Sequence, residues 1–218
     1  INRFGSVKYR TESAKVIANS YMLQCGTPFI YQGQEIGMTN IKLPELDMYV
    51  DVATFNTYDI CKKLGFPHKS IMKRLMRASR DNARTPVQWT SGKNAGFTTA
   101  DTPWFSINEN YTAINVAAQE KDPGSVLNYY RHLTGLRKRE QVILDGVYEE
   151  ILAEREDLLA YARDNGENRL TVAANFTSQT IPFPTEIFAD AGNYEIGNYA
   201  DAPSGNVLRP FEAVMYLK

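Results

Sequence analysis

The sequence predicts an α/β region over residues 1–144 followed by an all-β domain over residues 145–218, and the change in hydrophobic period along the chain supports this division. Apolar residues recur at spacings of three and four over residues 124–140, as they do on one face of a helix. Over residues 170–176 and 211–217, apolar residues recur at every second position, which is typical of strands. We therefore expect helices to precede a separate antiparallel sheet.

The α/β prediction depends on one helix that leads into one strand. Residues 12–24 place apolar side chains near helical spacing and end at the turn residues Gly26 and Pro28. Residues 27–31 form a short apolar run closed by Gly33, which predicts a buried strand. A helix followed by such a strand is the order found in parallel sheets, so half of an α/β repeat is visible.

Two further segments lie between this strand and the helix over residues 124–140. Residues 34–58 are largely acidic and polar, and a loop of this length favours a functional lid or pocket wall. Residues 68–79 form a basic amphipathic pattern. We expect a helix whose Ile71, Leu75 and Met76 face a core rather than a membrane.

Composition and charge exclude several classes of partner. With 24 basic and 25 acidic residues the formal net charge is −1, which disfavours nucleic acid as a partner. No apolar run reaches the roughly 18 residues of a membrane span, and the first residues lack a signal-peptide core, so no membrane partner is expected. Cys25 and Cys61 are too few for a disulfide scaffold and predict reduced thiols in the cytoplasm. Because residue 1 is an isoleucine, we expect the chain to begin inside a longer protein.

Four sequence blocks occur in an order that is specific to one group of enzymes. They are GTPFIYQGQEIGMTN at 26–40, SRDNARTPVQW at 79–89, NAGFT at 94–98 and PWFSINENY at 103–111. Together they resemble the oligo-1,6-glucosidase and dextran glucosidase branch of the α-amylase superfamily, glycoside hydrolase family 13. Similar blocks occur in sucrose isomerases and trehalose-6-phosphate hydrolases, so the resemblance defines the branch better than the substrate.

This resemblance implies a fold and a location for the active site. The fold is the last segment of a (β/α)₈ TIM barrel followed by a small antiparallel β-sandwich. Residues 12–24, 27–31 and 125–140 would match the seventh helix, the eighth strand and the eighth helix of the barrel. Because active sites of such barrels lie at the carboxyl ends of the strands, residues 31–35 would border the site.

The resemblance also implies that the catalytic groups are absent from this chain. Retaining glycoside hydrolysis needs a carboxylate nucleophile and a carboxylic acid about 5 Å apart, and the family supplies them from strands four and five. A third carboxylate comes from an Asn-His-Asp motif a few residues before a segment like residues 3–5, and neither His68 nor His132 precedes an Asp. We therefore expect an inert fragment of a retaining, exo-acting α-glucosidase for α-1,6 or related bonds, with no catalytic residue, metal or cofactor in this chain.

Three residues are the candidate substrate-binding residues. By resemblance, Arg80 matches the arginine that grips the 4-hydroxyl of the terminal glucose together with an upstream aspartate. The structural alternative is that Arg80 caps the preceding helix or pairs with Asp81. Arg84 is expected to hold the turn together instead. Gln34 and Glu35 are predicted to bind sugar hydroxyls, with a buried network beneath the pocket as the alternative for Glu35.

Several features leave the substrate open. Ala53 stands where many relatives have a glutamate that would contact the second sugar, which puts acceptor selectivity in doubt. Trp89 and Trp104 are interpreted as packing residues rather than sugar-stacking ones.

The alternatives for function are a sucrose isomerase, a trehalose-6-phosphate hydrolase, or a non-enzymatic relative such as a transporter heavy chain. The expected partner of the whole protein is an α-linked gluco-oligosaccharide. The chain alone is expected to self-associate through exposed barrel surface.

Overall fold

The computed structural model describes residues 1–218, which form two compact units. The sheet unit comprises Ile1, residues 3–37 and residues 122–218, and the helical unit comprises Asn2 and residues 38–121. Strands begin at residue 147, close to the predicted start of the β domain. The predicted boundary at residue 145 lies within the sheet unit. This unit also contains a helix from residues 3–37 and a helix from residues 122–145, and both pack on the sheet. As a boundary between family domains it stays a prediction.

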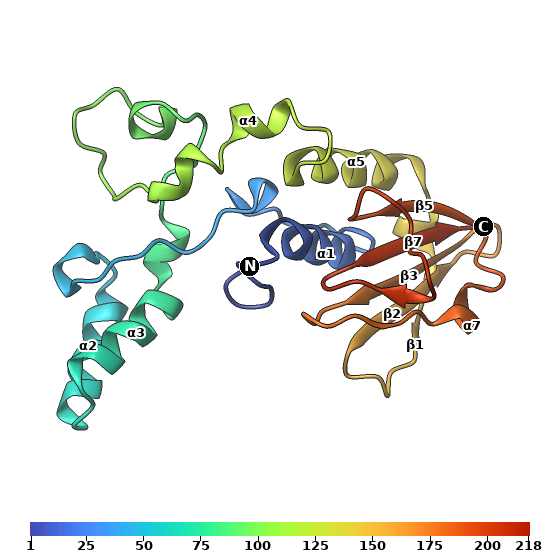
Figure 1. Ribbon diagram of the computed structural model, residues 1–218, viewed down its shortest axis with the longest axis horizontal. Helices are drawn as coiled ribbons and strands as arrows, with labels where there is room; N and C mark the ends of the chain where they lie inside the picture. Colours follow the sequence, from blue (N-terminus) through green and yellow to red (C-terminus); the bar gives the residue numbers. More distant parts are fainter. The chain divides into compact units, whose positions relative to one another are not determined.

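The sheet unit combines helices with all the strands of the chain (Figure 1). Its elements are α1 (Arg10–Met22), the 3-10 helix η1 (Gln34–Ile36), α5 (Val126–Arg139), α6 (Val142–Asp145), β1 (Val147–Ile151), β2 (Leu158–Asp164), β3 (Arg169–Asn175), β4 (Ile181–Pro182), α7 (Thr185–Phe188), β5 (Asn193–Gly197), β6 (Val207–Leu208) and β7 (Ala213–Leu217).

The main sheet has five strands in the order β1-β2-β3-β7-β5, and every neighbouring pair is antiparallel. The predicted strands over residues 170–176 and 211–217 correspond to β3 and β7, which pair with Val172 opposite Met215. Six of the seven residues of β3 are buried, including residues on both faces of the strand. Both faces of the sheet are therefore covered.

Helices cover one face and a second small sheet covers the other. Helices α1 and α5 lie side by side over the first face (Figure 1), where Leu133 of α5 packs in one core with Tyr161, Val172 and Met215. On the opposite face the two-stranded sheet β4-β6 packs its fully buried Leu208 in a core with Ala173 and Val214. The predicted antiparallel domain is present, with a second β layer of only two short strands.

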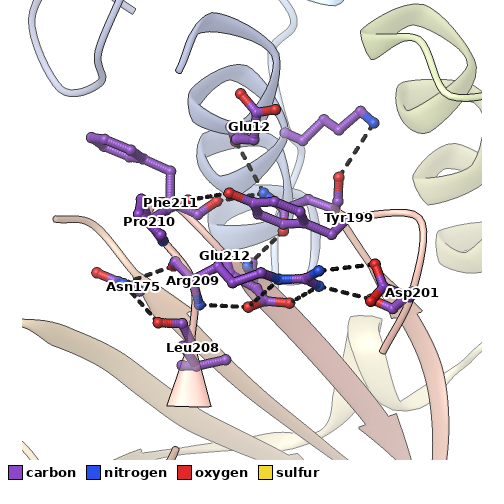
Figure 2. A network of polar contacts seen from close by, with 12 residues as sticks. Glu12, Asn175, Tyr199, Asp201, Leu208, Arg209, Pro210, Phe211 and Glu212 are labelled. Atoms are coloured by element: carbon purple, nitrogen blue, oxygen red, sulfur yellow. Dashed lines mark hydrogen bonds and ion pairs between the residues drawn. The ribbon is translucent and has the colours of Figure 1, made fainter. Parts of the chain in front are cut away.

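A polar cluster closes the loop between β5 and β7 (Figure 2). The Arg209 guanidinium lies 4.0 Å from the ring centre of Tyr199 and donates to Asp201 Oδ1 at 2.9 Å and Glu212 Oε2 at 3.0 Å. Because Glu212 is 1% exposed, its charge needs this pairing inside the fold. The neighbouring Asn198 side chain donates to Glu12 O of α1 at 3.1 Å, which ties the loop to the helix layer.

The strand predicted over residues 27–31 is absent. The backbone there pairs with no strand, and the side chains of Phe29, Ile30 and Tyr31 are 86%, 41% and 57% exposed. The prediction of a buried strand is wrong for the chain as it stands, because a strand requires a hydrogen-bonded neighbour. Every paired strand of this chain lies in the antiparallel sheets of residues 147–217.

The helical unit is built of short helices. They are η2 (Leu46–Met48), α2 (Val52–Lys63), α3 (His68–Ala78), η3 (Arg80–Ala83), η4 (Lys93–Gly96), η5 (Glu109–Thr112) and α4 (Val116–Glu120). No helix of the chain has both the length and the apolar character needed to cross a membrane.

Helix α3 confirms one prediction and α2 corrects another. In α3, Ile71 and Leu75 are buried as expected, and Met72 rather than Met76 is the buried methionine. The polar loop predicted over residues 34–58 ends earlier, because α2 begins at Val52. Phe55 and Tyr58 of α2 pack against the core that contains α3, and this tertiary packing favours a helix where the local sequence indicated a loop.

Candidate functional site

Gln34 and Glu35 lie in a tight turn that the sheet unit holds in place. Their 3-10 helix η1 is flanked by Gly33 and Gly37 with φ of 82° and 64°, a left-handed backbone that glycine adopts without strain. The Arg10 side chain of α1 donates to Ile36 O at 3.2 Å and Gly37 O at 3.1 Å. The turn is thus anchored to α1 through its backbone, which leaves its side chains to make other contacts.

Both ends of the Gln34 side chain are used inside the protein. Its Oε1 accepts from the backbone N–H of Tyr31 at 3.1 Å, and its Nε2 donates to the Tyr21 hydroxyl at 3.2 Å. Tyr21 in turn donates to the hydroxyl of Tyr130 on α5 at 3.2 Å. Gln34 therefore belongs to a network that joins η1, α1 and α5, which is a structural role beside the predicted sugar contact.

Glu35 lies next to this network with one carboxylate oxygen unpaired. Its Oε2 is buried and has no hydrogen-bond partner. Burial raises the pKa values of Tyr21 and Tyr130, and the negative charge of Glu35 adds to both shifts. The two hydroxyls therefore stay protonated as donors. A buried oxygen without a donor is unusual in proteins, and Glu35 Oε2 has unused capacity to accept a hydrogen bond.

Arg80 begins η3 in the helical unit, directly after the residue that caps this turn. Its side chain is exposed and makes no hydrogen bond or ion pair. The structural alternative for Arg80, pairing with Asp81, is absent from the structure. Its guanidinium has all five of its donors available for an external ligand.

Arg84 instead pairs with Asp81, as the turn-holding role predicted for it requires. Its Nη1 and Nη2 lie 3.4 Å from Asp81 Oδ1 and 3.4 Å from Asp51 Oδ1, respectively. Asp81 is fully buried, and its Oδ2 accepts the backbone N–H groups of Val50 at 2.9 Å and Asp51 at 3.1 Å. We call Asp81, Arg84 and Asp51 the aspartate lock. It joins η3 to the start of α2.

Three further residues singled out in the sequence lie in the helical unit. Ala53 is exposed in the first turn of α2, directly beyond the aspartate lock. Trp89 and Trp104 are 48% and 64% exposed. Trp104 lies 5.5 Å from Phe105 between ring centres, and the interpretation of both tryptophans as packing residues stays a prediction.

The candidate residues fall into two groups, each described within its own unit. Gln34 and Glu35 share one turn of the sheet unit, and Arg80 lies in the helical unit. Sequence reasoning missed the residues that support them, which are Arg10, Tyr21 and Tyr130 for the first group and Asp51 for the second. No local signal identifies these partners, because each lies more than ten residues away in sequence from the group it supports.

Comparison with known proteins identifies the family of the chain. Residues 1–146 match the model for the α-amylase catalytic domain. The oligo-1,6-glucosidase of Parageobacillus thermoglucosidasius is 42% identical to the chain over 224 aligned positions, which include 99% of this chain and 40% of that protein. The chain therefore spans about 40% of the length of such curated relatives.

Solved structures give the same result in three dimensions. Trehalose-6-phosphate hydrolase of Bacillus licheniformis superimposes with a TM-score of 0.89 at 38% identity, covering 99% of this chain and 40% of that one. Isomaltulose synthase of Klebsiella sp. LX3 superimposes with a TM-score of 0.88 at 33% identity, covering 98% of this chain and 39% of that one. The chain belongs to the α-amylase family, glycoside hydrolase family 13, among relatives that include oligo-1,6-glucosidases and trehalose-6-phosphate hydrolases.

Proposed function

We propose that this chain is the carboxy-terminal part of a retaining, exo-acting α-glucosidase that hydrolyses α-1,6 or related bonds in gluco-oligosaccharides. The observation that carries the proposal is the exposed, unpaired Arg80, whose neighbour Asp81 is already paired with Arg84. An arginine with unused donors suits the recognition of adjacent sugar hydroxyls. Curated oligo-1,6-glucosidases about 40% identical to the chain support this substrate class.

In the whole protein, residues 1–144 would form the last segment of a (β/α)₈ barrel, and residues 145–218 would form the β domain that follows it. The exposed apolar segment 27–31 would then pair with neighbouring barrel strands supplied by the rest of the protein. The turn with Gln34 and Glu35 follows this segment, so both residues would border the active site. The unpaired Oε2 of Glu35 would accept a hydrogen bond there.

The division of labour follows from the chemistry of retaining hydrolysis. The nucleophile, the acid/base and the third carboxylate would come from the part of the protein before Ile1. Arg80 would fix the 4-hydroxyl of the terminal glucose and thereby limit the enzyme to chain ends. Gln34 would support the site mainly through its contacts with Tyr21 and Tyr31.

Replacing Arg80 by alanine in the whole protein tests the proposal. We expect kcat/KM for an aryl α-glucoside to fall roughly ten- to a hundredfold, because a charged hydrogen bond to a sugar hydroxyl contributes about 1.5 to 3 kcal/mol. Thermal stability should change little, since the Arg80 side chain is exposed and makes no hydrogen bond or ion pair within residues 1–218. The matched control is Lys73→Ala, which removes an exposed cation from α3. Unchanged kinetics of Arg80→Ala would exclude the assigned role.

Trehalose-6-phosphate hydrolysis and sucrose isomerisation are the alternative activities, supported by the similar solved structures. Incubating the whole protein with isomaltose, trehalose-6-phosphate and sucrose, followed by product analysis, separates the three. A non-enzymatic heavy chain would turn over none of them and would lack the three carboxylates before Ile1. We also propose a cytoplasmic location, in keeping with the two free cysteines, Cys25 and Cys61.

Separated from the rest of the barrel, the chain should self-associate. Its exposed segment 27–31 presents Phe29 and Ile30, and uncovered apolar segments recruit partners. Light scattering of the isolated chain is expected to give a mass above 24.6 kDa that rises with concentration. The variant Phe29→Ser should lower this mass, while Lys8→Ser at another exposed position should not. A stable monomer across the concentration range would contradict the proposal.

A further inference from the structure

The aspartate lock begins directly after Arg80, because Asp81 is the next residue in the sequence. We propose that Asp81 and Arg84 are positioning residues that act through Arg80: they fix its backbone and keep its guanidinium free for substrate. The inference rests on the proposed function, because it needs Arg80 to bind the sugar.

The residues on both sides of Arg80 are fixed by polar contacts. The Ser79 hydroxyl accepts the backbone N–H of Asp81 at 3.1 Å and shares a hydrogen bond of 2.8 Å with the Thr54 hydroxyl of α2. The Asp81 carboxylate accepts two backbone N–H groups from the segment that leads into α2, those of Val50 and Asp51. The Cα of Arg80 is therefore held from both sides by contacts to the same segment.

Unlike Ser79 and Asp81, Arg80 makes no polar contact through its side chain. Fixing the backbone while leaving the guanidinium unpaired reduces the entropy that substrate binding would otherwise remove. A sugar hydroxyl would then bind an arginine whose backbone is already fixed. This arrangement is preorganisation of a binding group rather than a contact with substrate.

Arg84 contributes through charge. Asp81 is a fully buried carboxylate, and a buried charge without a counter-ion is strongly unfavourable. Arg84 supplies that counter-ion, at 3.4 Å from Asp81 and 3.4 Å from Asp51. Without Arg84, the adjacent unpaired cation, Arg80, would be the group available to neutralise Asp81. Arg84 thus prevents Asp81 from capturing the sugar-binding arginine.

The charge of Asp81 also affects Tyr49, which precedes Val50 and lies in one core with Ile71 and Leu75 of α3. Burial raises the pKa of Tyr49 to about 12, and the negative charge of Asp81 adds to the shift. The Tyr49 hydroxyl therefore stays protonated and donates to Leu43 O at 3.0 Å. This hydrogen bond holds Tyr49, which directly precedes the two residues, Val50 and Asp51, whose backbone N–H groups bind Asp81.

A double-mutant cycle in the whole protein tests the inference. Arg84→Met should lower kcat/KM for an aryl α-glucoside about tenfold, mainly through KM, because Arg80 would turn toward Asp81. In an Arg80→Ala background the same change should have almost no further effect. The 4-deoxy analogue of the substrate should likewise lose little on Arg84→Met, since it lacks the hydroxyl that Arg80 would bind.

Two further variants separate positioning from general damage. Arg84→Lys keeps a cation beside Asp81 and should recover most of the activity lost in Arg84→Met. Asp81→Asn removes the charge that attracts Arg84. It should cause no further loss of kcat/KM in an Arg80→Ala background, and no loss with the 4-deoxy analogue as substrate. If Asp81→Asn does not fold, the Arg84 variants decide alone. Lys73→Met, at an exposed position of α3, is the matched loss of a cation and should leave the kinetics unchanged.

The outcomes distinguish this inference from the proposed function. If Arg80→Ala alone leaves kcat/KM unchanged, the proposed role of Arg80 fails. If Arg80→Ala lowers kcat/KM but the full penalty of Arg84→Met persists in its presence, the positioning role is wrong and the lock is purely structural. Non-additive losses with recovery by Arg84→Lys support the inference.

Discussion

The isolated chain of 218 residues is expected to release no glucose from isomaltose or from an aryl α-glucoside, whereas the whole protein should do so with retention of configuration. Retaining hydrolysis requires a nucleophile and an acid about 5 Å apart, and under the proposed assignment both precede Ile1. Enzymes lower activation free energies by about 8 kcal/mol or more, while a sugar-binding arginine contributes about 1.5 to 3 kcal/mol. Arg80 cannot compensate for the missing groups.

Two assays of glucose release, with and without the upstream part of the protein, measure this effect. Adding the upstream part as a separate polypeptide is an informative control, because recovered activity would show that the isolated chain was folded and lacked only the carboxylates. Turnover by the isolated chain alone would overturn the assignment of catalysis to residues before Ile1.

Truncating the core between helix and sheet should have the largest effect on stability. Leu133 of α5 is 0% exposed and packs in one core with α1 and the main sheet. We expect Leu133→Ala to lower the free energy of unfolding of the sheet unit by about 2 to 5 kcal/mol, since deleting a buried leucine removes hydrophobic burial and leaves a cavity. Urea unfolding followed by circular dichroism measures the change.

Lys138 provides the control on the same helix. It is exposed, so Lys138→Ala should change stability by less than about 0.5 kcal/mol. A loss for Leu133→Ala no larger than that of Lys138→Ala would mean that α5 does not pack on the sheet as described.

The candidate site was predictable where a local motif marks it. The block containing Arg80 identified this residue, and the expectation that Arg84 stabilises the turn agrees with its contacts with Asp51 and Asp81. The buried Oε2 of Glu35 and the tie between Gln34 and Tyr21 could not be predicted, because they depend on where α1 and α5 place their tyrosines. The roles of Arg80, Gln34 and Glu35 toward substrate stay predictions.

The sequence by itself determined the elements whose periodic patterns are strong. Helices α3 and α5 and strands β3 and β7 lie where the hydrophobic spacing placed them. A local repeat of apolar residues predicts them, because it puts those residues on one buried stripe or face of the element. The family could likewise be identified from four short blocks in order.

Tertiary structure decided the features that depend on distant partners. It placed the start of α2 at Val52, since packing against α3 outweighs a polar local sequence. It left residues 27–31 unpaired, because a strand exists only with a neighbour to bond. It also joined Asp81 to Arg84 and to the backbone of residues 50 and 51, while the exposed Arg80 side chain has no such contact in this chain. A local pattern reports which residues are apolar or charged, but the pairing of buried groups is set by the three-dimensional contacts between segments.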